Sequence, residues 1–130
     1  MGLIDRFFRQ FQRPEDNFLG HAAGKLMAAT TGGRNEWTLS LLKIRPDDRI
    51  LDIGYGPGVG ILLASRKIRE GTVVGIDPSE AMRKQAERRN RRAIREGKVR
   101  LFTGNIEDWP GPDHSFTRIF SVNSAPFWTD

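Results

Sequence analysis

The sequence predicts an α/β fold in which a parallel sheet carries helices on both faces. An apolar run at residues 50–53 indicates a buried strand, and a glycine loop and a helical pattern at 61–68 follow it. A second apolar, β-branched run at 72–77 ends on an acid. A strand, a helix and a strand over this length form a βαβ unit, in which the two strands are parallel.

Length and composition indicate one domain with a sizeable core. A chain of 130 residues buries roughly two thirds of its unfolded surface on folding. No apolar run approaches the ~20 residues that cross a bilayer, and the N-terminus lacks the apolar stretch of a signal peptide. The absence of cysteine excludes disulfides and thiolate metal sites, and His21 and His114 lack ligand-like spacing. We expect a cytoplasmic protein that holds no metal and contacts no membrane.

Three helical patterns precede the first strand. Apolar residues recur at helical spacing over 3–13 and over 17–31, and a third helix at 36–42 has Asn35 as its N-cap. Basic residues are too sparse here for a polybasic membrane anchor, so we favour packing on the sheet. Trp37 is expected in the core.

Gly54, Gly56 and Gly58 form the loop between the first strand and its helix. Glycine permits positive φ and close backbone approach, and the helix start offers unpaired N–H groups, so an anionic group should lie there. The dinucleotide fingerprint G-x-G-x-x-G fails, because its third glycine position holds Val59 or Ile61. No Walker A lysine follows either. A glycine turn without a ligand is the alternative.

Two acids accompany the loop. Asp52 stands two residues before the first glycine, and Asp77 ends the next strand. Ligands of a parallel sheet bind at the carboxyl ends of its strands, so Asp77 and the loop should lie side by side. A helix N-cap is the alternative role for Asp77. The pattern resembles motif I of the class I S-adenosylmethionine-dependent methyltransferases, in the run Asp52-Ile53-Gly54-Tyr55-Gly56-Pro57-Gly58.

The resemblance implies a Rossmann-like fold that binds S-adenosylmethionine. The loop would hold the methionine end of the cofactor, Asp52 would order the loop and the ammonium group, and Asp77 would bind the ribose. A third strand at 99–103 leads to Asn105, which stands where the family usually carries Asp and would read the adenine edge. A polar turn is the alternative there. The cofactor-binding residues implied are Asp52, Gly54, Tyr55, Gly56, Gly58, Asp77, Pro78, Asn105, Ile106 and Asn123.

The chain contains four of the seven strands that the family carries. The fourth, at 116–123, ends at Asn123, which would point toward the transferred methyl group. We therefore expect a fold truncated after the fourth strand, with residues 1–45 as a helical lid and 46–130 as an incomplete core. The unpaired edge of the fourth strand invites homodimerisation.

A helical pattern at 79–98 concentrates the positive charge. It carries eight basic and three acidic residues, and the difference of +5 equals the net charge of the whole chain. Such a helix could bind nucleic-acid phosphates. It lacks interleaved aromatics and would lie away from the strand ends, so we interpret it as a solvated face and disfavour nucleic acid as a partner.

These features predict an S-adenosylmethionine-dependent methyltransferase that acts on a small molecule. Methyl transfer by in-line displacement requires mainly that the protein position its reactants, and no catalytic residue is identified. Two alternatives stay open. The chain could be a non-catalytic fragment that binds S-adenosylmethionine or a partner chain, or an RNA or DNA methyltransferase that uses the basic helix.

Overall fold

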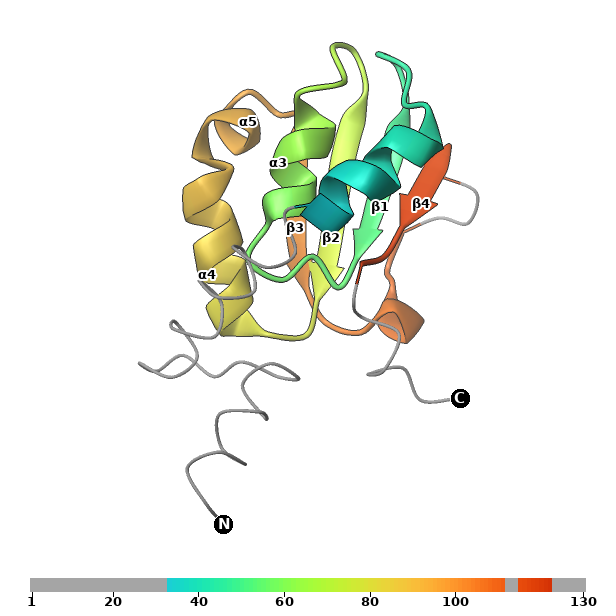
Figure 1. Ribbon diagram of the computed structural model, residues 1–130. Helices are drawn as coiled ribbons and strands as arrows, with labels where there is room; N and C mark the ends of the chain where they lie inside the picture. The colour runs from blue at the N-terminus through green and yellow to red at the C-terminus, as the bar shows by residue number, and fades with distance from the viewer. Residues whose placement is uncertain (1–32, 112–114, 123–130) are drawn as a thin grey trace.

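The computed structural model describes residues 33–111 and 115–122, which form a four-stranded parallel sheet (Figure 1). All three strand pairings are parallel. The predicted α/β, Rossmann-like class is confirmed, as are the first three strands. The sheet has the order β3-β2-β1-β4, with β1 at Arg49–Ile53, β2 at Thr72–Asp77, β3 at Val99–Thr103 and β4 at Arg118–Phe120.

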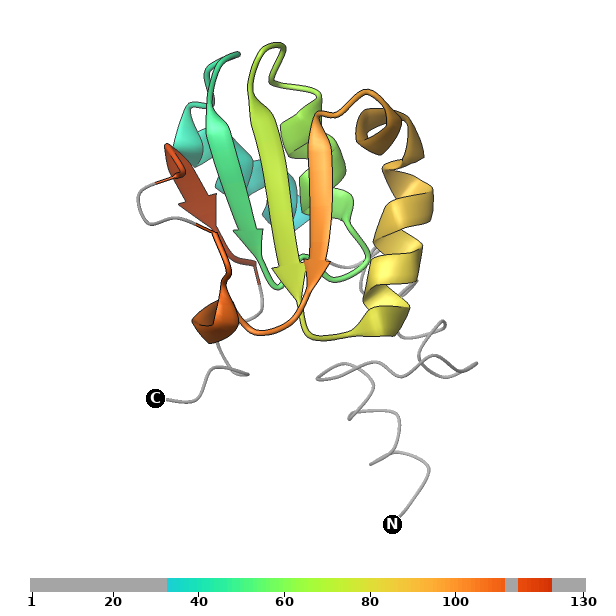
Figure 2. The same ribbon diagram turned by 180° about the vertical axis from the view of Figure 1, so that it is seen from behind.

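The described helices cover one face of this sheet, whereas the sequence predicts helices on both faces. The helix at residues 33–42 and α3 (Val59–Ser65) lie over it, while α4 (Glu80–Arg89) and α5 (Arg91–Arg95) flank α3 on the β3 side (Figure 1). No α-helix of the described residues covers the opposite face (Figure 2). The described part of the connection from β3 to β4 holds the 3-10 helix η1 (Ile106–Asp108), which is too short to cover it.

Aromatic rings pack on the opposite face instead. The Trp109 ring lies 5.4 Å from the Phe102 ring in an edge-to-face arrangement and 5.6 Å from the Phe116 ring, measured between centroids. The Arg100 guanidinium lies 5.5 Å from the Phe102 centroid. Successive strand residues point to opposite faces, so Arg100 and Phe102 share this face while Val99 points to the helices. The cluster holds the connection after β3 against the sheet.

The core lies between the sheet and the helices that cover it. Ile50, Val73 and Val99, one from each of the three long strands, are buried there. Ile61 from α3 and Leu39 from the helix at 33–42 complete the contact. Burial of one such side chain stabilises the fold by roughly 1.5–3 kcal/mol, so Leu39 alone gives the helix at 33–42 a substantial attachment.

Two expectations for the helix at 33–42 are wrong. Asn35 is not its N-cap, because residues 33 and 34 are already helical, and the Asn35 side chain is buried. Trp37 is 66% exposed rather than in the core. Leu41, one turn later on the same side, is 61% exposed, so the apolar positions of this helix divide between two faces.

The helix predicted at 79–98 is broken at Asn90. α4 ends at Arg89, and Asn90 leaves the helical region with φ −106° and ψ 18°. The buried Asn90 amide group donates hydrogen bonds to the carbonyl oxygens of Ala86, at 3.0 Å, and of Gly58, at 3.1 Å. The bond to Gly58 ties the break to a segment 32 residues earlier, which explains why the local pattern does not indicate it.

The fourth strand is shorter than the prediction of 116–123. β4 pairs with β1 over three residues, and the Ser121 hydroxyl then donates to the Ile53 carbonyl oxygen at 2.9 Å. Ile119 is 55% exposed. None of the described helices is long and apolar enough to span a membrane. Asn123 lies outside the described residues, as does most of the predicted lid, including the helices predicted at 3–13 and 17–31.

Candidate functional site

The glycine loop connects β1 to α3 at the carboxyl edge of the sheet. Gly54, Gly56 and Gly58 all have positive φ, at 72°, 53° and 87°, a conformation that side chains disfavour. The Gly54 amide donates to the Ile76 carbonyl oxygen at 2.8 Å, and the Gly58 amide donates to the Tyr55 carbonyl oxygen at 3.0 Å. The backbone therefore requires glycine at the three positions that the sequence singled out.

Asp77 lies directly beside this loop. One oxygen of its carboxylate, Oδ2, accepts the Gly56 amide at 2.9 Å, and Oδ1 accepts the Ser79 amide at 2.9 Å. The N-cap of α4 is Ser79, whose hydroxyl accepts the Met82 amide at 3.2 Å. Asp77 is therefore not the N-cap, and its predicted position next to the loop is what the structure shows.

Asp52 is buried beneath the start of α3. A Cβ atom at Gly60 would lie 3.0 Å from Asp52 Oδ2 and 2.6 Å from Asn35 Oδ1, so Gly60 permits the close approach of this helix to both polar groups. Asp52 is 2% exposed. The carboxyl thus lies against the first turn of α3, whereas its ordering of the loop and its contact with a cofactor ammonium group stay predictions.

Burial dominates the electrostatics of the two carboxyls. Desolvation raises the pKa of Asp52 well above its ordinary value, and the nearby charge of Asp77 raises this pKa further. Desolvation also raises the pKa of Asp77, while the hydrogen bonds from the Ser79 and Gly56 amides oppose that shift. A cationic group brought to this edge would favour the charged form of both acids.

The Tyr55 side chain is part of the core. Its ring covers Gly75 of β2, where an added Cβ would lie 2.5 Å from Tyr55 Cδ2, and its hydroxyl donates to the Phe102 carbonyl oxygen at 3.3 Å. Burial raises the pKa of the phenol. Tyr55 therefore fixes the middle of the loop onto β2 and β3, and its predicted cofactor contact stays a prediction.

α4 holds the loop from the other side, through residues that the sequence analysis did not select. Arg89 Nη1 donates to the Pro57 carbonyl oxygen at 2.6 Å, and Asn90 Nδ2 donates to the Gly58 carbonyl oxygen. A Cβ at Gly58 would lie 2.7 Å from Ala86 Cβ. The sequence does carry one sign of this role for Asn90. It is a polar residue at the position that continues the buried stripe of Met82 and Ala86, at intervals of four.

The remaining predicted residues lie at the ends of β2 and β3. Pro78 is exposed directly after Asp77. Asn105 is exposed after β3, and its carbonyl oxygen accepts the Asp108 amide at 3.1 Å as η1 begins. Ile106 is half-buried. The Gly104 amide donates to the Asp77 carbonyl oxygen at 2.9 Å, so the loops after β2 and β3 are joined at this edge.

The donor and acceptor set at this edge fits a zwitterionic nucleoside. The Asp77 carboxylate can receive an ammonium group or hydroxyls, because each of its oxygens retains a second acceptor site beyond its amide bond. The amides of Gly54, Gly56 and Gly58 already donate within the protein, so these glycines offer a ligand close backbone approach rather than free N–H groups. Within the described residues, no group of three or more histidines and acids is placed to hold a metal ion.

Comparisons with known proteins agree with this geometry. A family model described as a methyltransferase domain matches residues 50–130. YdaC, an uncharacterised methyltransferase of Bacillus subtilis, is 38% identical over 108 residues, which cover 83% of this chain and 58% of YdaC. The chain therefore spans little more than half the length of this relative.

Two solved structures share the fold of this chain, and their sequence identities to it are nearly equal. The YcgJ protein of Bacillus subtilis superposes with a TM-score of 0.63 and 28% identity, covering 74% of this chain and 40% of YcgJ. The second is geranyl diphosphate C-methyltransferase of Streptomyces coelicolor, solved with Mg²⁺, geranyl-S-thiolodiphosphate and S-adenosyl-L-homocysteine. It superposes with a TM-score of 0.60 and 27% identity, covering 68% of this chain and 32% of that enzyme. The chain belongs to the methyltransferase domain family, among the class I S-adenosylmethionine-dependent methyltransferases.

Proposed function

We propose that this chain forms the S-adenosylmethionine-binding half of a methyltransferase that acts on a small molecule. The observation that carries the proposal is the hydrogen bond from the Gly56 amide to Asp77 Oδ2, which joins the glycine loop to the acid at the end of β2. The ligand is an amino acid linked to a nucleoside. The glycine turn can face its amino-acid end, and the carboxylate in contact with the turn can face its nucleoside end.

Each residue at this edge has a proposed role. Gly54, Gly56 and Gly58 let the backbone approach the methionine end of the cofactor closely, and Asp52 orders the loop from below. Asp77 accepts the ribose hydroxyls, with Pro78 beside it. Asn105 and the Ile106 amide bind the adenine edge, and Tyr55 holds the loop on the sheet.

S-adenosylmethionine supplies a sulfonium methyl group, which a nucleophile takes as the carbon–sulfur bond breaks and S-adenosylhomocysteine leaves. The described residues therefore orient the cofactor and exclude water, with no acid–base pair required at the methyl group itself. Asn123, which lies beyond the described residues, keeps its predicted role toward that methyl group.

A small-molecule acceptor is supported by one comparison and by the site. The neighbour from Streptomyces coelicolor is a geranyl diphosphate C-methyltransferase, an enzyme with a small organic substrate. The described residues at the carboxyl edge carry a compact group of carboxylates and amides rather than a long basic track.

The experiment measures cofactor binding and turnover separately. Titration calorimetry of the 130-residue chain with S-adenosylhomocysteine reports binding, and formation of S-adenosylhomocysteine from S-adenosylmethionine with a panel of small acceptors reports transfer. Binding with turnover supports the proposal. Binding without turnover supports the alternative of a fragment that binds S-adenosylmethionine without transferring its methyl group, and absence of binding refutes both.

A further inference from the structure

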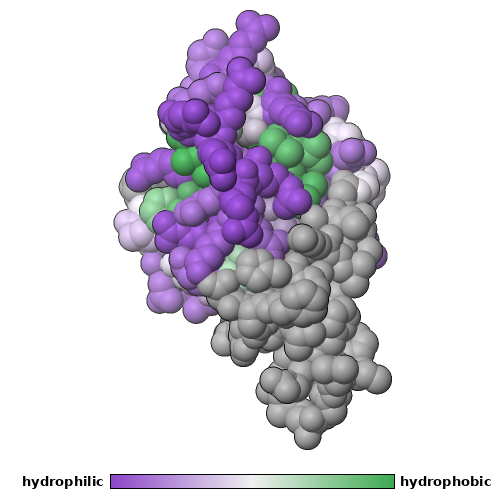
Figure 3. Space-filling view, turned by 90° about the vertical axis from the view of Figure 1, so that its left-hand side faces the viewer, coloured by the Kyte–Doolittle hydropathy of each residue, from purple (hydrophilic) through white to green (hydrophobic). Residues whose placement is uncertain are grey.

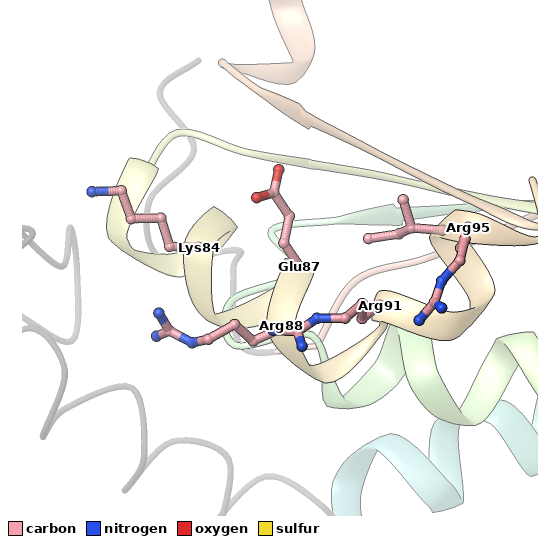
Figure 4. Close-up of a pocket in the computed structure, with 6 residues that line it drawn as sticks. Lys84, Glu87, Arg88, Arg91 and Arg95 are labelled. Carbon is pink, nitrogen blue, oxygen red and sulfur yellow. The ribbon is translucent and has the colours of Figure 1, made fainter.

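A basic groove runs along the outward side of α4 and α5. It contains an open hollow of about 570 Å³ lined by Lys84, Glu87, Arg88, Arg91, Ile94 and Arg95. Figure 4 shows the lysine and the three arginines extending from successive turns of the two helices. None of the glycine-loop residues lines this hollow, so it is separate from the cofactor edge.

The four cations share one side of the helix pair. Lys84 and Arg88 are four residues apart in α4, and Arg91 and Arg95 are four residues apart in α5, so each pair lies on one side of its helix. All four are exposed. The space-filling view of this side shows a hydrophilic ridge over α4 and α5 (Figure 3). The four side chains therefore place positive charge along one side of the helix pair.

Neighbouring ion pairs leave the groove positive. Glu87, the acid of the lining, is paired with Arg83 at 2.8 Å, and Arg92 is paired with Glu96 at 2.9 Å outside the hollow. Among the described residues, Arg88, Arg91 and Arg95 have no acidic partner within ion-pair distance. The guanidinium groups of Arg88, Arg91 and Arg95 outnumber the one carboxylate that lines the same hollow, which favours an anionic partner.

The chemistry of the lining selects among anionic partners. Arginine forks match the oxygens of discrete phosphate groups, and a row of them matches phosphates spaced along a strand. A membrane surface would be better bound by a face that adds inserted apolar side chains. Ile94 is half-buried, and the large exposed apolar side chains of the described residues, Trp37, Leu41 and Ile119, lie on other elements.

We propose that the groove of Lys84, Arg88, Arg91 and Arg95 binds the phosphate backbone of a single-stranded nucleic acid, without reading its sequence. No aromatic side chain lines the hollow, so base stacking and base recognition are absent from this contact. The nucleic acid is a tethering partner and not the methyl acceptor. The sequence pattern indicated a solvated face, because it shows neither the hollow nor the ion pairs that isolate the three arginines.

Binding of a labelled single-stranded RNA, measured by fluorescence anisotropy over a range of salt concentrations, tests the proposal. The groove variant R88Q/R91Q/R95Q is compared with the charge-matched control R66Q/K67Q/R69Q, whose replaced residues are exposed near the end of α3. Removal of three phosphate contacts lowers the slope of log affinity against log salt by about 2. The control variant should keep the wild-type slope, and different RNA sequences should bind alike.

Three outcomes would overturn the proposal. They are no RNA binding by the wild type, an equal loss in the groove and control variants, and a groove variant that loses binding to phosphatidylglycerol vesicles while retaining RNA. Thermal unfolding establishes that each variant is folded. S-adenosylhomocysteine affinity should be unchanged in the groove variant, so failure of this proposal is distinguishable from failure of the proposed cofactor site.

Discussion

The Gly56 amide donates a 2.9 Å hydrogen bond to Asp77 Oδ2, across 21 residues of sequence. This bond makes the glycine loop and the end of β2 one structural unit. The other oxygen of the same carboxylate holds the Ser79 amide at the start of α4. Asp77 therefore shapes the site in the structure as it stands, and the proposed ribose contact is an additional role for the same side chain.

Asp77→Ala should destabilise the fold and free the loop. Two buried amides lose their acceptor, which costs about 2–4 kcal/mol when each unsatisfied amide costs ~1–2 kcal/mol. Asp77→Asn keeps one acceptor oxygen, so its free energy of unfolding should fall by less. Urea denaturation gives the free energy of unfolding, and amide hydrogen exchange should show a loss of protection at Gly56. Unchanged protection at Gly56 in the alanine variant would show that the bond is unimportant.

Gly58→Ala should lower the free energy of unfolding far more than Gly97→Ala does. Both glycines have positive φ, at 87° and 77°, so each substitution carries the left-handed penalty of about 1–2 kcal/mol. Only at Gly58 does the new Cβ meet other atoms, at 2.7 Å from Ala86 Cβ, whereas nothing lies within 4 Å at Gly97. Overpacking adds about 1–3 kcal/mol. Equal unfolding free energies for the two variants would contradict the close contact between loop and α4.

Asn90→Ala should loosen the loop from α4. The side chain is 1% exposed and bonds to the carbonyl oxygens of Gly58 and Ala86. Its loss should cost about 1–3 kcal/mol in the free energy of unfolding, together with a weaker affinity for S-adenosylhomocysteine. Arg92→Ala is the control, because Arg92 is exposed and pairs with Glu96 one turn away, so its removal should change stability by less than about 0.5 kcal/mol. Equal losses in the free energy of unfolding for both variants would show that Asn90 does not hold the loop on α4.

Asn90 also shows the limit of prediction from the sequence. The strands β1, β2 and β3, the glycine loop and Asp77 were predictable, because apolar runs, turn residues and strand-end acids are local signals. The break between α4 and α5 was not, since its cause is a hydrogen bond to Gly58, 32 residues earlier. The exposure of Trp37 was missed for a related reason: periodicity identifies the apolar positions of a helix but not which of them meet the sheet.

Asp52→Asn should stabilise the protein increasingly as pH rises above about 4 toward the raised folded-state pKa of Asp52. Burial raises the folded-state pKa of Asp52 above its unfolded value of roughly 3.9. The folded state therefore binds more protons than the unfolded state in this window, and the contribution of Asp52 to stability is lost as pH rises through the folded pKa. Asn lacks this titration. A difference in unfolding free energy between variant and wild type that is independent of pH would show that Asp52 titrates normally.

Thermal unfolding of the 130-residue chain with and without S-adenosylhomocysteine tests the central claim most directly. A ligand that binds only the folded state at about 100 times its dissociation constant stabilises it by about 2.7 kcal/mol. We predict a rise in Tm for the wild type that grows with ligand concentration and is abolished in Asp77→Ala. A wild-type Tm that does not move at any ligand concentration, or a rise of equal size in Asp77→Ala, would contradict a cofactor site built on the Gly56 and Asp77 contact.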